Sequence, residues 1–109
     1  MTQERKDGEE RRSVRRYAVD IDVEWEGKIG RQNGTVSDIS TLGCFVLCSG
    51  EVDDGESVSI FIPLGDGMKV QFLGEVVNHV FEIGFGVKFV NLNDAQGEFL
   101  RTLIESIDK

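Results

Sequence analysis

The stretch Val19-Asp20-Ile21-Asp22-Val23-Glu24-Trp25-Glu26 alternates strictly between apolar and acidic residues. Because successive side chains of a β-strand point to opposite faces, this period of two predicts a strand that buries one face and exposes an acidic one. A half-buried strand needs neighbours, and the rest of the sequence supplies segments of the same type.

Five further segments are predicted to be strands, at 29–39, 44–48, 57–64, 69–78 and 83–89. Gly27 and the pair Asp66-Gly67 supply turns between neighbouring strands. The segment 44–48 is apolar at every position, which predicts burial on both faces. Gly74 indicates a bulge or a sharp bend within the fifth strand.

The period changes near the C-terminus, where a helix is predicted at about 93–107. Asn93 followed by Gln96 resembles a capping box at its start. Five apolar residues then fall on one helical face: Phe99, Leu100, Leu103, Ile104 and Ile107. This stripe must be buried, either across an open barrel end or against another subunit. The expected fold is mainly β, a six-stranded antiparallel β-barrel with a C-terminal α-helix, since closure removes exposed sheet edges.

We expect residues 1–16 to form a flexible tail, because they are charged and lack periodicity, and residues 17–109 to form one barrel domain. The formal net charge of −8 argues against general nucleic-acid binding, which depends on neutralising phosphates. No apolar run approaches the ~20 residues of a membrane span, and the N-terminus lacks a signal peptide's apolar stretch. We therefore expect a cytoplasmic protein without membrane insertion.

Cys44 and Cys48 are the only cysteines. Four residues apart on one strand, their Cα atoms would be separated by ~13 Å, whereas a disulfide requires less than ~7 Å. Two free thiols are typical of a reducing compartment. His79, the single histidine, is predicted to be a solvated loop residue. With one histidine, neither a zinc site nor a nucleophile–base pair is expected, so we predict no cofactor, no metal site and no enzymatic activity.

Two short motifs carry the functional prediction. The cluster Arg11-Arg12-Ser13-Val14-Arg15-Arg16 holds four arginines and no acid, ahead of an otherwise acidic chain. In Asp38-Ile39-Ser40-Thr41-Leu42-Gly43, a strand would point the carboxylate and the hydroxyl the same way, and Gly43 adds no side chain. A flat ligand could approach this small polar surface closely. One arginine cluster on an acidic body indicates a small, planar anion rather than a long polyanion.

An RxxxR motif before the first strand and DxSxxG after the second resemble the PilZ domain, a family of small bacterial β-barrels, many of which bind cyclic di-GMP. The resemblance extends from about Arg11 to the C-terminal helix. It implies that arginines grip the phosphates and guanines, that Asp38 accepts from a guanine edge, that Ser40 donates one hydrogen bond and that Gly43 leaves room for the ring.

Two registers of the arginine motif are open, Arg11/Arg15 and Arg12/Arg16. We favour Arg12/Arg16, because the family's second arginine directly precedes the first strand, and Arg11 and Arg15 then become auxiliary phosphate contacts. The family often has an aromatic residue at the end of the fifth strand, where this chain has Asn78. That difference puts one stacking contact in doubt.

The resemblance leads to a receptor whose arginine tail orders over the barrel on binding cyclic di-GMP and presents a new surface to a downstream protein partner. The main alternative is a nucleotide-independent adaptor with the same fold, which the intact arginines disfavour. A single-stranded nucleic-acid barrel would want basic and aromatic residues on its outer face, where the first strand is acidic instead.

Overall fold

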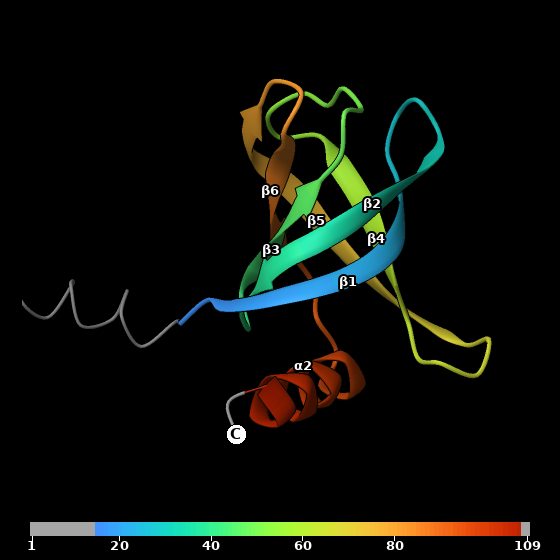
Figure 1. The fold of residues 1–109 in the computed structure, drawn as a ribbon, viewed down its shortest axis with the longest axis vertical. Helices are drawn as coiled ribbons and strands as arrows, with labels where there is room; N and C mark the ends of the chain where they lie inside the picture. The colour runs from blue at the N-terminus through green and yellow to red at the C-terminus, as the bar shows by residue number, and fades with distance from the viewer. Residues whose placement is uncertain (1–14, 108–109) are drawn as a thin grey trace, which may run out of the picture.

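The computed structural model describes residues 15–107 and confirms the mainly β fold. Its elements, in chain order, are β1 (Tyr17–Glu26), β2 (Arg31–Ile39), β3 (Gly43–Leu47), β4 (Ser57–Pro63), β5 (Lys69–Val80), β6 (Gly84–Phe89) and α2 (Asp94–Ile107). The strands form one closed antiparallel barrel in the order β1-β2-β3-β6-β5-β4 (Figure 1). Among the described residues, no helix combines the length and the apolar character that crossing a membrane requires.

The barrel is closed unevenly. β1 pairs with β2 from Tyr17 to Glu26, but it pairs with β4 only from Glu24 to Glu26, opposite Phe61 to Ser59. Beyond this short seam the two strands separate, and the β4–β5 hairpin projects away from the barrel (Figure 1). The barrel wall is therefore paired along the length of β3 and β6 but interrupted beside the β1–β4 seam.

The inward-facing residues of all six strands build one apolar core. The alternation predicted for β1 is observed, since Val23 and Trp25 are buried while their acidic neighbours face outward. The Trp25 ring meets Phe85 edge to face, with ring centroids 4.9 Å apart, a geometry that aromatic pairs favour. The hydrophobic pattern thereby fixes which face of each strand points inward.

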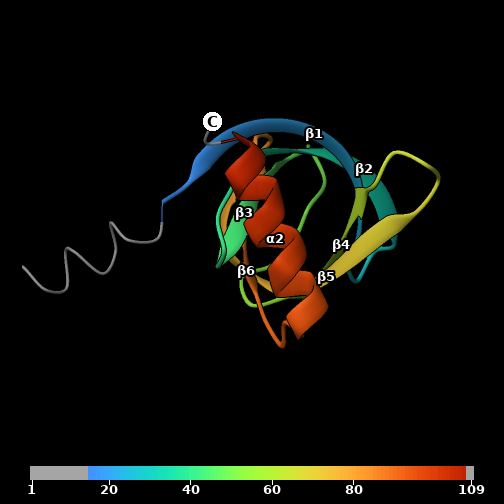
Figure 2. The ribbon, with the colours of Figure 1, turned by 90° about the horizontal axis from the view of Figure 1, so that it is seen from below.

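Helix α2 crosses one end of the barrel, which is the first of the two arrangements that its apolar stripe allowed (Figure 2). Leu100 is buried in the core, and Phe99, Leu103 and Ile107 pack against it. The capping box is present, because the Gln96 amide donates to Asn93 Oδ1 at 2.7 Å and the Asn93 amide donates to Gln96 Oε1 at 2.8 Å.

Several strand boundaries differ from the sequence prediction. β3 runs from Gly43 to Leu47, so Cys48 lies outside it, and β5 extends to Val80. Ile29, Leu64 and Ile83 were each assigned to a strand, but they lie outside β2, β4 and β6 and are exposed. All three belong to hairpin connections, where an apolar residue beside a strand imitates the alternation without facing the core. Sequence periodicity locates strands more securely than their ends.

Three local predictions are wrong. β3 is buried on one face only, since Leu47 points outward and is 40% exposed. Gly74 pairs regularly with Val58 and Phe89, and the bulge of β5 lies between Val76 and Asn78. His79 lies within β5, opposite Phe85, rather than in a loop. The structure gives Gly74 a different role, because a Cβ there would collide with the Val87 side chain.

Docking of α2 is predicted to depend on Leu100. We expect Leu100→Ala to lower the free energy of unfolding by about 3 kcal/mol, because it removes a fully buried side chain and leaves a cavity. The exposed neighbour Thr102 provides the control: Thr102→Ala should change stability by less than about 0.5 kcal/mol. Urea denaturation followed by tryptophan fluorescence measures both variants, and equal stability of the two would show that the helix does not close the core.

Candidate functional site

A hollow of about 420 Å³ lies on the outer face of the β3-β6-β5 wall. This volume is within the range typical of small-molecule sites. The hollow brings together residues from the chain start, the β2–β3 turn and three strands, and its lining consists of Arg16, Ser40, Leu42, Gly43, Phe45, Val77, Asn78, Gly86, Val87 and Lys88. Four of the predicted site residues therefore line one cavity: Arg16, Ser40, Gly43 and Asn78.

Asp38, another predicted site residue, does not line the hollow but contacts Arg16, which does. The Arg16 guanidinium donates from Nε to Asp38 Oδ1 at 3.1 Å, and its Nη2 lies 3.1 Å from the same oxygen. Both side chains are partly exposed, at 56% and 32%. The two motifs, 22 residues apart in sequence, are thus in direct contact, and Arg16 is one of the residues that line the hollow.

The base of the hollow is the turn from Ser40 to Gly43. Ser40 is buried, and its hydroxyl oxygen accepts from the Leu42 amide at 3.0 Å and from the Gly43 amide at 3.2 Å. The Ser40 amide donates to the Gly43 carbonyl at 2.8 Å. A serine hydroxyl that satisfies two backbone donors in this way fixes the conformation of a turn. The Ser40 hydroxyl also donates to the Gly43 carbonyl, but this hydrogen bond is weak, with a donor–acceptor distance of 3.5 Å.

Gly43 is required by packing rather than by a left-handed conformation. Its φ is not among the positive values of the described glycines. A Cβ at this position would fall onto the Val87 carbonyl oxygen of β6. The absent side chain lets β3 approach β6, and Gly86 on the neighbouring strand then leaves the floor of the hollow low between Phe45 and Asn78.

Beneath this surface lies Cys44, which is fully buried. The pKa of the Cys44 thiol is raised to about 12, mainly by burial and also by the Asp38 carboxylate, while Arg16 partly offsets the increase. The thiol is therefore protonated at neutral pH and behaves as an apolar core group. Cys48 is also free, and desolvation raises its pKa as well.

Of the four predicted arginines, Arg11 and Arg12 lie outside the described residues. Arg15 is exposed, and its guanidinium lies 5.2 Å from the centre of the Tyr17 ring, within the range of a cation–π contact. Lys88 is a further cation at the hollow, and among the residues that the structure describes it has no ion-pair partner.

Sequence reasoning missed the apolar walls of the hollow and Lys88. Phe45 was assigned to a strand buried on both sides. It alternates with the inward-facing Cys44 and Val46, which places its side chain on the outer face. The alternation of β6 likewise gives an outward Lys88. The same alternation places Val77 outward after the buried Val76, and the bulge between Val76 and Asn78 leaves Asn78 exposed as well.

The sequence of residues 9–106 matches the PilZ domain family, and the chain belongs to that family. Comparison with curated proteins finds no match.

Several solved structures share the fold. The chain is similar to the PilZ domain of CeSA from a cellulose-synthesizing bacterium, with 20% identity, a TM-score of 0.69 and coverage of 87% of this chain and 99% of that one. It is similar to the PilZ domain with c-di-GMP of YcgR from Escherichia coli, with 15% identity, a TM-score of 0.74 and coverage of 90% and 92%.

The inhibitor of motility MotI/DgrA of Bacillus subtilis is also similar, with 17% identity and a TM-score of 0.70. There the match covers 91% of this chain and 52% of that chain, so the chain spans about half the length of that protein. At these identities the three comparisons establish a common barrel.

Replacing Gly43 tests the packing at the base of the hollow. We expect Gly43→Ala to destabilise the protein by about 2 kcal/mol, because its methyl group has no room beside the Val87 carbonyl. Gly97, in α2, is the matched control: a Cβ there meets nothing within 4 Å, so Gly97→Ala should stabilise by about 0.5–1 kcal/mol through helix propensity. Thermal unfolding compares the two, and an unaffected Gly43→Ala variant would contradict the close approach of β3 and β6.

Proposed function

We propose that the chain is a cyclic di-GMP receptor domain, in which the arginine motif and the β2–β3 turn bind one ligand together. The observation that carries the proposal is the contact between Arg16 and Asp38 beside a hollow whose lining includes Arg16, Ser40 and Gly43. Membership of the PilZ family and the likeness to a PilZ domain described with c-di-GMP support the choice of ligand.

The residue types suit this ligand. Arginine can grip phosphate as a fork, donate to guanine O6 and N7, and stack on the base, whereas lysine supplies mainly charge. Arg12 and Arg16 would make the principal contacts, with Arg11 and Arg15 as auxiliary phosphate contacts. Asp38 would accept from the N1–H and N2–H₂ edge of guanine. Ser40 and Gly43 would hold the floor against which the ring lies, with the Ser40 proton available to the ligand.

The Arg16–Asp38 pair suggests how binding could be coupled to a change in the tail. Without ligand, each group satisfies the other. A guanine edge would replace Arg16 at Asp38, and the freed guanidinium would turn to phosphate or base together with the other arginines. Ordering the tail costs free energy, so we expect micromolar affinity, about −8 kcal/mol. The ordered tail would then form part of a surface for a downstream protein partner.

The proposed role is that of a binding domain rather than an enzyme, and it requires no cofactor. A cytoplasmic location is part of the proposal, and the two free thiols support it. Asn78 stands at the edge of the hollow, where it would offer a hydrogen bond instead of an aromatic stacking face.

The alternative, a nucleotide-independent adaptor, is favoured by the β5–β6 hairpin. Phe81 and Ile83 are 69% and 53% exposed, and Glu82 between them has a φ of 61°, a conformation that disfavours its side chain. Two large apolar side chains held in solvent on such a turn are typical of a contact with another protein.

Removing an arginine should separate the two functions. We expect Arg16→Ala and Arg12→Ala each to abolish calorimetric binding of cyclic di-GMP while the circular dichroism spectrum is unchanged. Arg101, exposed on α2, is the matched control, and Arg101→Ala should bind normally. Unchanged binding in both tail variants would remove the arginine role, whereas no binding of cyclic di-GMP by the wild-type chain would favour the adaptor.

Lys88 offers an independent test of the hollow. We expect Lys88→Ala to weaken binding about tenfold, because a cation beside the hollow contributes to holding a phosphate. Lys88→Arg should retain most of the affinity, since it retains the charge. Isothermal titration at two salt concentrations measures the effect, and Lys88→Ala with wild-type affinity and salt dependence would place the ligand elsewhere.

A further inference from the structure

The first half of β1 has one edge without a strand partner. Within the described chain, residues 17–18 and 21–23 pair with β2, and no strand pairs with this part of β1 on the β4 side. Helix α2, which crosses this end of the barrel, also contacts β1. β4 ends at Pro63, which has no N–H to donate. Backbone groups on an unpaired strand edge form a template for another strand.

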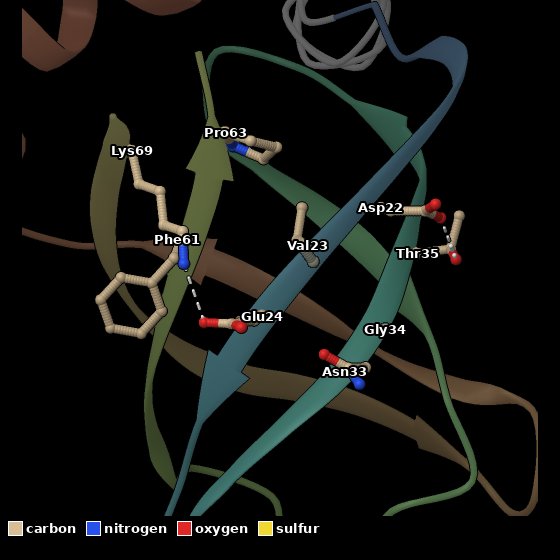
Figure 3. A pocket seen from close by; sticks show the side chains of 9 residues that line it. All are labelled: Asp22, Val23, Glu24, Asn33, Gly34, Thr35, Phe61, Pro63 and Lys69. Atoms are coloured by element: carbon tan, nitrogen blue, oxygen red, sulfur yellow. Dashed lines mark hydrogen bonds and ion pairs between the residues drawn. The ribbon is translucent and has the colours of Figure 1, made fainter. Parts of the chain in front are cut away.

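A second cavity, of about 570 Å³, opens where β1 and β4 separate (Figure 3). Asp22 and Val23 line it from β1, and Phe61 and Pro63 line it from β4. Glu24 and Phe61 form the last β1–β4 pair, so the cavity begins where the pairing stops. A strand that extended the sheet from this point would run beside β1 in the position that a longer β4 would take.

The charges along β1 are compensated unequally. Glu24 is satisfied by Lys69 at 3.1 Å and by Arg31 at 3.4 Å, and Lys69 holds the pKa of Glu24 below its usual value. Asp20 and Asp22 are exposed, and neither has an ion-pair partner among the described residues. The uncompensated carboxylates therefore lie on the same part of β1 as the open edge.

The opposite face of this segment is apolar. Val19 and Ile21 are partly buried and pack against the core. A strand added at this edge would thus find carboxylates on its outer side and apolar groups on its inner side. A bulge between Ala18 and Ile21 interrupts the regular pairing of β1 with β2. The residues best placed to pair with an added strand are therefore Ile21, Asp22 and Val23.

We propose that this edge binds an extended segment of a partner protein in which basic and apolar residues alternate, by adding a strand to β1. The charges select this occupant over a second copy of the same strand, because pairing two β1 edges would bring Asp20 and Asp22 against their own counterparts. Basic side chains on the outer face would instead compensate both. The site is distinct from the cyclic di-GMP hollow and does not rest on that proposal.

The test uses the full chain without nucleotide and a synthetic peptide, acetyl-Arg-Val-Arg-Val-Arg-Val-amide, titrated by nuclear magnetic resonance. We expect the largest amide shifts at Ile21, Asp22 and Val23, with Ser40 and Lys88 unmoved. The double variant Asp20→Asn/Asp22→Asn should bind about fivefold more weakly. Asp54→Asn, at an exposed loop position, should bind as wild type.

Two further peptides test strand addition itself. One carries N-methyl groups on the three arginine amides and the other on the three valine amides. Because amides of alternating residues point to opposite edges of a strand, one of these peptides should lose binding at least about tenfold and the other should bind within about twofold of the parent.

Equal effects of the two methylations would overturn the proposal, as would no binding by the wild-type protein at millimolar peptide or equal binding by the Asp20/Asp22 and Asp54 variants. Dimerisation in sedimentation equilibrium that the peptide displaces would also overturn it, since the occupant would then be a second copy.

Discussion

The constraint on which the candidate site depends is the close contact between the β2–β3 turn and β6. Three hydrogen bonds within four residues, two of them accepted by the Ser40 hydroxyl, hold the turn. Gly43 then brings β3 so near the Val87 carbonyl that a side chain would not fit. Asp38 lies two residues before this turn, on β2, with its carboxylate against Arg16. The DxSxxG motif therefore shapes the barrel wall, in addition to the ligand contacts proposed for it.

Sequence reasoning could predict the barrel because the apolar alternation of its strands is physically forced. Val23 and Trp25 face the core, and a shift of one residue would turn them to water. A local motif, Asn93 followed by Gln96, likewise predicted the reciprocal cap of α2. Apolar alternation failed at Ile83, because an apolar residue in a turn continues the pattern although its side chain is exposed.

The candidate site could be predicted in part. The sequence motifs identified Arg16, Asp38, Ser40 and Gly43, which the structure brings together. Their spacing did not disclose that the Ser40 hydroxyl oxygen accepts two hydrogen bonds within the turn, since such bonds leave no trace in a sequence pattern. The walls of the hollow depend on which strands become neighbours, and the bulge of β5 leaves Asn78 exposed beside Val77, which strand alternation alone does not predict. The open edge of β1 is likewise a property of strand lengths in the closed barrel.

The exchange of partners at Asp38 is the central claim, and the Nε–H resonance of Arg16 reports it directly. In the structure the Nε–H group of Arg16 donates a hydrogen bond to Asp38 Oδ1 at 3.1 Å. When cyclic di-GMP is titrated into the full chain, the account predicts that this resonance and the amides of Asp38 and Ser40 shift together and saturate in the micromolar range. If all three remain unmoved at high micromolar ligand, the barrel stands but the nucleotide-binding account is contradicted.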